Sequence, residues 1–128
     1  MDKHRIHTDN APAAIGPYSQ GIRIGNLVFT AGQMGYTPAG EPAGEDIATQ
    51  TEQVLNNLSA ILEAAGTDMA HVVKTTVFLQ SMGDFATMNA IYARYFTEPF
   101  PARTTVEAAA LPRNVLVEIE CVAVLPEG

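Results

Sequence analysis

The chain has 128 residues with a net charge of −7, and 47% of its residues are hydrophobic. A chain of this length is typical of one domain, so residues 1–128 are predicted to fold as a single domain. The excess of acidic side chains repels phosphate backbones and anionic membrane surfaces, which makes nucleic acid and membranes poor candidates for partners.

The first 45 residues carry turn and strand signals. Residues 10–21 (NAPAAIGPYSQG) are punctuated by Pro and Gly and predict an irregular lead-in, preceded by a short tail. Residues 22–24 (IRI) and 27–30 (LVFT) favour strands and flank Gly25-Asn26, a two-residue turn signal, so a β-hairpin is predicted there. Residues 36–45 show no periodicity and predict a loop.

A change of period marks the next elements. From Asp46, apolar residues recur at three- and four-residue spacing, which predicts a long amphipathic helix ended by a left-handed cap at Gly66. Residues 72–79 (VVKTTVFL) predict a central strand, and a second helix follows with Asp84 as its N-cap and Pro99 as its stop. Residues 100–124 predict two strands joined by a turn. The predicted order is β-β-α-β-α-β-β, an α+β fold with a mixed sheet and two helices.

The last predicted strand has two different faces. Two helices cover one face of such a sheet, and side chains alternate between the faces along a strand. One face of residues 115–124 is apolar, whereas the other mixes apolar residues with two glutamates: Leu116, Glu118, Glu120, Val122 and Val124. If Val106 points under the helices, Arg103 and Thr105 join the glutamates on this open face. The mixture of apolar and charged side chains predicts a subunit interface and therefore an oligomer.

Cysteine, histidine and hydropathy patterns limit the chemistry and the compartment. Cys121 is the only cysteine, which excludes an intrachain disulfide, and its apolar strand neighbours predict a buried structural thiol. His4, His7 and His71 form no ligand cluster along the chain, so no metal site is predicted. Neither a signal peptide nor a membrane span is apparent, and the expected compartment is the cytoplasm.

Six sequence blocks resemble those of the YjgF family, whose best-known members are the reactive-intermediate deaminases called RidA. The blocks follow one another over nearly the whole chain: NAPAAIGPYSQG, NLVFTAGQ, VVKTTVFL, DFATMNAIYARYF, FPAR and LPRNVLVEIE. The resemblance implies a chorismate-mutase-like fold, with both helices on one face of the sheet. It also implies a homotrimer whose sheets surround a central barrel and whose active sites lie in clefts between adjacent subunits.

The resemblance also implies an activity. RidA-like members hydrolyse reactive 2-enamine and 2-imine acids, such as 2-aminoacrylate and 2-aminocrotonate, to 2-oxo acids and ammonia. Pyridoxal-phosphate-dependent dehydratases release these species from serine and threonine, so a functional link to those enzymes is implied. No metal or organic cofactor is implied for this chain itself.

Two charged residues match the family's catalytic positions. Arg103 matches the substrate-binding arginine, whose planar fork can hold a carboxylate by two parallel hydrogen bonds. A structural alternative for Arg103 is a salt bridge between subunits. Glu118 matches the glutamate that positions or activates the attacking water. The alternative for Glu118 is a structural partnership with Arg103 or Lys74.

Five further positions are candidates for the pocket by the same resemblance. Tyr18 would border it, although a plain packing role is an alternative, and Gly32 would let the backbone approach a ligand. Asn89 matches a frequent pocket residue, whereas its simpler interpretation is a helix-surface asparagine. Ala31 and Thr105 depart from the family, which often has serine and cysteine there. We expect these two departures to change substrate preference more than activity.

Three other functions compete with this hypothesis. A family member acting on another enamine, such as an aminoacrylate or aminomuconate pathway intermediate, would keep the arginine and change the pocket walls. A non-catalytic trimer that binds 2-oxo acids, or acts like a chaperone, would not need both Arg103 and Glu118. A ribonuclease or translation inhibitor is disfavoured by the charge of −7.

Overall fold

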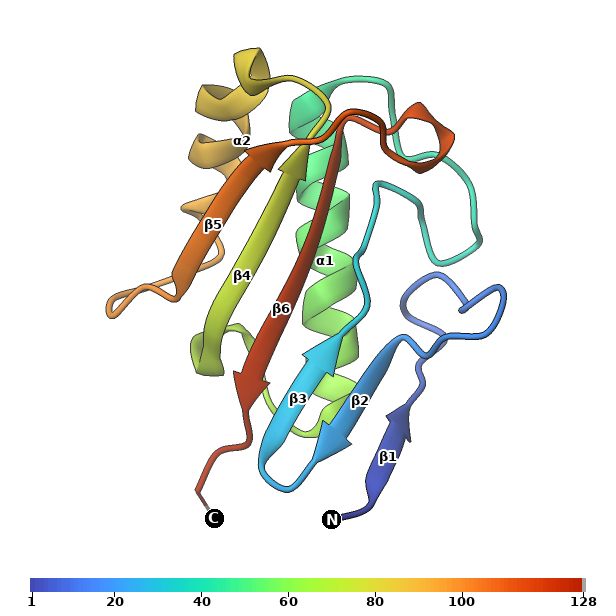
Figure 1. The fold of residues 1–128 in the computed structure, drawn as a ribbon, viewed down its shortest axis with the longest axis vertical. Coiled ribbons are helices and arrows are strands. Elements are labelled where there is room, and N and C mark those ends of the chain that lie inside the picture. Colours follow the sequence, from blue (N-terminus) through green and yellow to red (C-terminus); the bar gives the residue numbers. More distant parts are fainter. Residues whose placement is uncertain (128) are drawn as a thin grey trace.

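The computed structural model describes residues 1–127 and contains six strands and two α-helices. Both helices lie against the same face of one sheet (Figure 1). The sheet has the strand order β1-β2-β3-β6-β4-β5, in which β4 and β5 pair in parallel and the other neighbours are antiparallel. The elements in chain order are β1 (Lys3–Ile6), β2 (Gly21–Ile24), β3 (Leu27–Thr30), α1 (Ile47–Ala65), β4 (Val72–Leu79), α2 (Phe85–Tyr92), β5 (Ala102–Glu107) and β6 (Val117–Val124).

The α+β architecture is confirmed, but the sheet has one strand more than predicted. β1 occupies the segment that was expected to be a tail, and it pairs antiparallel with β2 at the edge of the sheet. Among its residues only Ile6 is buried, so β1 has no apolar alternation. Its strand conformation therefore depends on pairing with β2 rather than on a local hydrophobic pattern.

Helix α1 forms as its sequence predicts. The Asp46 side chain accepts a hydrogen bond from the Thr49 N–H at 3.0 Å, and Gly66 ends the helix in the left-handed conformation with φ of 91°. The buried stripe of α1 contains five fully buried apolar residues, Val54, Leu55, Leu58, Ile61 and Leu62. This stripe anchors the helix to the sheet and supplies much of the core.

Helix α2 differs from the prediction at both ends. The Asp84 side chain makes no capping hydrogen bond; instead, Ser81 caps a preceding 3₁₀ turn by accepting from the Gly83 N–H at 3.1 Å. The helix ends at Tyr92, well before Pro99, although Phe96 still packs in the core. Turns after Tyr92 end the helix, so Pro99 is not its stop.

Strand β6 shows the predicted alternation. Val117, Ile119 and Ala123 are fully buried beneath the helices, whereas Glu118 is half-buried and Glu120 is exposed on the other face. Within residues 1–127, no helix combines the length and apolar character needed to cross a membrane.

Candidate active site

Arg103 faces the helices, not the open face of the sheet. The parallel register pairs Arg103 with Thr75 and Val106 with Phe78. Thr75 is fully buried and its hydroxyl hydrogen-bonds the Tyr92 hydroxyl of α2 at 2.8 Å, whereas Val106 is 41% exposed. Val106 therefore does not lie under the helices, so the condition under which Arg103 and Thr105 would join the glutamates on the open face is not met.

Arg103 and Thr105 therefore both lie on the helix face of the sheet. Both residues alternate with Val106 along β5, so the direction of Val106 decides theirs. Apolar character suggested an inward Val106, but β5 is an edge strand, and the space beneath it is filled by polar and aromatic side chains of α2.

Helix α2 fixes the Arg103 side chain through three residues on one helical face. An Arg103 Nη1 atom donates to the Asn89 Oδ1 atom at 2.7 Å. The guanidinium carbon lies 4.8 Å from the Tyr92 ring centroid and 5.5 Å from the Phe85 ring centroid, within the range of cation–π attraction. The spacing of Phe85, Asn89 and Tyr92 places them on the same side of α2. Asn89 is thus a partner of Arg103 and not a plain surface residue.

Arg103 borders a cavity of about 400 Å³. Its lining residues come from the second half of α2 and from the segment leading into β5: Asn89, Tyr92, Ala93, Phe100, Pro101 and Arg103. Tyr92 is buried in the core, and it is also the platform for the guanidinium. The helical spacing of Phe85, Asn89 and Tyr92 is the sequence signal that could have revealed this role.

Thr105 occupies the same face, next to Val77 of β4. Its Oγ1 atom is buried without a hydrogen-bond partner among the described residues. A buried hydroxyl without a partner lowers the stability of the fold, a cost that the less polar thiol of cysteine reduces. The departure from the family at this position therefore has a structural consequence in the folded chain.

Glu118 lies on the opposite face of the sheet, against the backbone of Gly32. A Cβ atom added at Gly32 would overlap the Glu118 carboxylate, so the absence of a side chain there makes room for this group. Burial, and secondarily the nearby charge of Glu120, raises the pKa of Glu118. Across the described residues, neither Arg103 nor Lys74 pairs with Glu118; the Lys74 Nζ atom donates to the Thr104 hydroxyl at 2.8 Å.

A second cavity, of about 470 Å³, brings Tyr18 and Gly32 together. The lead-in residues form one wall and the segment after β3 forms another: Pro12, Ala13, Ile15 and Tyr18 face Gly32, Gln33 and Met34. Tyr18 is 52% exposed, and its hydroxyl oxygen accepts from the Ile15 N–H at 3.1 Å. Ala31 precedes Gly32 and donates its backbone N–H to the Gln20 carbonyl at 2.9 Å.

The predicted site residues therefore form two groups within one chain. Arg103, Asn89 and Thr105 lie on the helix face at the β5 edge. Glu118, Gly32, Ala31 and Tyr18 gather around the ends of β3 and β6, away from Arg103. β4 lies between β5 and β6 and separates the two groups.

Cysteine and histidine take no part in either group. Cys121 is buried as predicted, and burial raises the pKa of its thiol to about 11, so it stays protonated at neutral pH. The rings of His7 and His71 hydrogen-bond Asp9 and Asp68 respectively. Among residues 1–127, no group of three or more His, Cys, Asp or Glu side chains is arranged to hold a metal ion.

Known proteins are similar to this chain in sequence and in fold. The family model described as endoribonuclease L-PSP matches residues 8–125. Reactive Intermediate Deaminase A, chloroplastic, from Arabidopsis thaliana is 52% identical over 126 residues, which cover 98% of this chain and 67% of that protein. The 2-iminobutanoate/2-iminopropanoate deaminase of Escherichia coli K12 is 51% identical over 122 residues, covering 93% and 95% of the two chains.

A solved structure agrees with these relatives. The crystal structure of the Escherichia coli YjgF gene product matches with a TM-score of 0.90 at 49% identity, covering 94% of this chain and 98% of the other. The resemblance inferred from the six sequence blocks is confirmed. The chain belongs to the endoribonuclease L-PSP family, the family of YjgF and RidA.

Proposed function

We propose that this chain hydrolyses 2-enamine and 2-imine acids to 2-oxo acids and ammonia. Two relatives that are 52% and 51% identical are named as deaminases, one of reactive intermediates and the other of 2-iminobutanoate and 2-iminopropanoate. One structural observation carries the proposal. The Arg103 guanidinium is held in place beside a cavity by Asn89 and Tyr92, and no carboxylate of the described chain pairs with it.

The proposed site needs two copies of the chain. Arg103 and Glu118 point to opposite faces of the sheet with β4 between their strands, so they do not bracket one small substrate within a single chain. We therefore assign the carboxylate-binding group to one subunit and the Glu118–Gly32 group to its neighbour, in the homotrimer that the family resemblance implies. Exposed apolar side chains support such an association, since Phe29 and Val106 are each 41% exposed.

The chemistry follows from these two groups. Arg103 binds the substrate carboxylate, and the enamine tautomerises to the imine, whose C2 atom is electrophilic. Glu118 accepts a proton from water as the water oxygen bonds to C2, and C2 becomes tetrahedral. Glu118 passes this proton to the nitrogen, which gives a tetrahedral carbinolamine. The proton of the new hydroxyl group on C2 is then transferred to the nitrogen as well, the C2–N bond breaks, and ammonia leaves as the 2-oxo group forms. A raised pKa brings Glu118 closer to neutral pH, where a general base works best.

The substrates proposed here imply a source. Removal of water from serine or threonine leaves three- and four-carbon 2-enamine acids, so pyridoxal-phosphate-dependent dehydratases are the proposed suppliers. The cytoplasm is the proposed compartment. The description of the family names an endoribonuclease, but the net charge of −7 opposes RNA binding. RNA binding that weakens steeply with added salt would contradict this choice.

A competition experiment tests the activity. A threonine dehydratase generates 2-aminocrotonate in place, semicarbazide traps the imine, and the purified protein competes with the trap. We expect added wild type to divert flux from the trapped product to 2-oxobutanoate. Binding of 2-oxobutanoate without faster loss of the imine would identify a binding protein instead of an enzyme.

Subunit mixing tests the two-chain site. Arg103→Ala and Glu118→Gln are each expected to be inactive alone, and they are unfolded and refolded together in equal amounts. Random assembly should place an intact Arg103 opposite an intact Glu118 in about a quarter of the sites, which restores that share of wild-type activity. Mixtures that stay inactive, although light scattering shows that they have reassembled, would mean that both residues serve the same chain.

Gly32→Ala is expected to lower activity while the protein stays folded. The added Cβ displaces the Glu118 carboxylate, and a displacement of about 1 Å at a reacting group can cost about 10²-fold in rate. Steady-state kinetics measures this effect, which should appear in kcat. Gly83→Ala is the matched control, because its Cβ meets only the Ser81 Oγ atom, at 3.3 Å. Unchanged kcat in Gly32→Ala would remove Glu118 from the proposed chemistry.

A further inference from the structure

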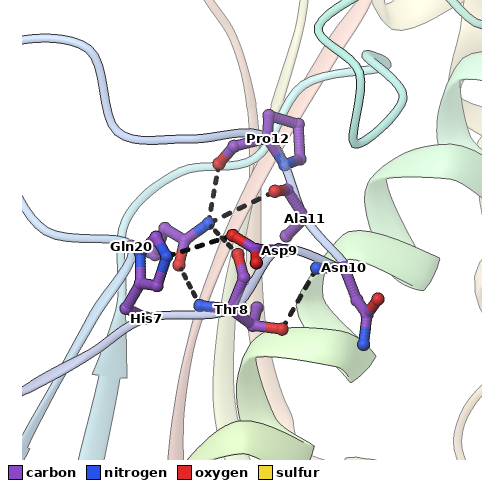
Figure 2. Close-up of polar contacts among 7 residues, drawn as sticks. All are labelled: His7, Thr8, Asp9, Asn10, Ala11, Pro12 and Gln20. Carbon is purple, nitrogen blue, oxygen red and sulfur yellow. Dashed lines mark hydrogen bonds and ion pairs between the residues drawn. The ribbon is translucent and has the colours of Figure 1, made fainter.

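Gln20 is a buried polar residue whose side chain organises the lead-in segment. It is 2% exposed, and its Oε1 atom accepts from the Thr8 N–H at 2.8 Å. Its Nε2 atom donates to the Thr8 carbonyl at 3.0 Å and to the Pro12 carbonyl at 2.8 Å, with a longer contact of 3.4 Å to the Ala11 carbonyl. Figure 2 shows these backbone groups converging on the one amide. The side chain therefore uses both of its donors and its acceptor on a single turn of backbone.

These hydrogen bonds close a loop that carries Tyr18. The Gln20 side chain reaches back to Pro12, so residues 12–20 form a loop fastened at both ends. Within this loop Ile15 is 76% exposed and Tyr18 is 52% exposed, which leaves little side-chain packing to hold them. The position of Tyr18 thus depends mainly on backbone hydrogen bonds and on the Gln20 amide.

The backbone of Gln20 connects the same loop to the proposed catalytic group. The Gln20 carbonyl accepts from the Ala31 N–H at 2.9 Å, and Ala31 precedes Gly32, which abuts Glu118. Gln33 and Ile119, the residues that follow Gly32 and Glu118, exchange two backbone hydrogen bonds, of 2.8 and 3.1 Å. The loop with Tyr18, which lines the 470 Å³ cavity, is therefore connected by backbone hydrogen bonds to the strand with Glu118.

We propose that Gln20 is a positioning residue for the deaminase site. Its amide closes the loop 12–20 and thereby fixes Tyr18 in the wall of the cavity that Gly32 also lines, and Gly32 in turn abuts Glu118. The inference rests on the proposed function and extends it to a residue that does not itself contact substrate. Glu118 is held by strand pairing and by the backbone of Gln20, not by the Gln20 amide, so loss of the amide should weaken substrate binding more than the chemical step.

A double-mutant cycle with Gln20→Met and Tyr18→Ala tests this. Methionine has nearly the same length and shape but makes none of the three strong hydrogen bonds. We expect Gln20→Met to raise KM for 2-iminobutanoate by about tenfold, with kcat within about twofold of the wild-type value. The reason is that the replacement removes hydrogen bonds only from the loop 12–20, which carries Tyr18 in the cavity wall. In the Tyr18→Ala background the same replacement should change KM by less than about twofold, since coupled residues are not additive.

Thr67→Val is the matched control. The buried Thr67 hydroxyl donates to the Val124 carbonyl at 2.7 Å, outside both cavities, so its loss should lower the melting temperature without raising KM.

Hydrogen exchange provides a second measurement, in which Gln20→Met should speed exchange at residues 11–18 and leave β4 and β6 protected. Gln20→Glu, which keeps the acceptor for Thr8 but loses the donors, replaces Gln20→Met if that variant does not fold.

The outcomes separate this inference from the proposed function. A wild type that does not hydrolyse the imine overturns both. An active wild type in which the Gln20 and Tyr18 effects on KM simply add, or in which exchange at residues 11–18 is unchanged, overturns the role of Gln20 alone.

Discussion

Glu118→Gln should remove imine hydrolysis and at the same time stabilise the fold at neutral pH. Positioned acid–base catalysis contributes roughly 10²- to 10⁴-fold to a rate, and we expect kcat to fall within this range. Glutamine keeps the size of the side chain and its contact with Gly32 but cannot accept the proton of water. The expected combination of lost activity and gained stability distinguishes a catalytic group from a structural one.

The stability effect follows from the raised pKa of Glu118. Because burial and Glu120 raise this pKa, the folded state binds the proton more tightly than the unfolded chain does. Ionised Glu118 therefore destabilises the fold at pH values above its folded pKa, and this cost disappears as the pH falls toward the unfolded value. The melting temperature of Glu118→Gln should exceed that of the wild type at pH 7, and the difference should shrink toward about pH 4.

The pH dependence of catalysis provides the control for this prediction. The active form of Glu118 is the carboxylate, so kcat/KM should fall as the pH decreases through its raised pKa. Glu120→Gln removes the neighbouring charge on the same strand face, which lowers the pKa of Glu118. The fall of kcat/KM at acidic pH should therefore occur at a lower pH in this variant, which stays catalytically active. A Glu118→Gln variant with more than about a tenth of wild-type kcat would contradict the general-base role.

Arg103→Ala should nearly abolish the diversion of flux in the semicarbazide competition. Losing one partner of a hydrogen-bonded charge pair in a desolvated site costs several kcal/mol, so we expect kcat/KM to fall by about 10²- to 10³-fold. The assay compares 2-oxobutanoate with the trapped imine at fixed semicarbazide, and circular dichroism checks that the variant is folded.

Two further variants sharpen the interpretation of Arg103. Arg103→Lys keeps the charge but loses the planar fork and its stacking on Tyr92, so it should recover only part of the activity. Arg5→Ala is the control, because Arg5 is an exposed arginine on β1, at the edge of the sheet opposite β5. Arg103→Ala that diverts as much flux as Arg5→Ala would show that this residue is not the carboxylate anchor.

Local patterns in the sequence were sufficient for the individual elements. The apolar stripe of α1 and its Gly66 cap depend on residues close in the chain, and they were predicted correctly. The alternation along β6 likewise separated the buried Val117 and Ile119 from Glu118. The six blocks also identified the family, because their residue types and order are specific to it. The roles of Arg103, Glu118 and Tyr18 stay predictions.

Pairing between distant segments decided the rest. β1 has one buried residue and becomes a strand because β2 pairs with it. The face of Arg103 depends on the register of β5 with β4, which no local pattern specifies, and an edge strand can leave a valine such as Val106 exposed.

The sequence by itself therefore determined the order of most elements, the core stripe of α1 and the family. Only the tertiary structure decided that Arg103 rests on α2 while Glu118 rests on Gly32 across the sheet, and that Gln20 closes the loop of Tyr18. The physical reason is that periodicity reports which side chains share a face. Which neighbour covers that face is set by long-range strand pairing and packing.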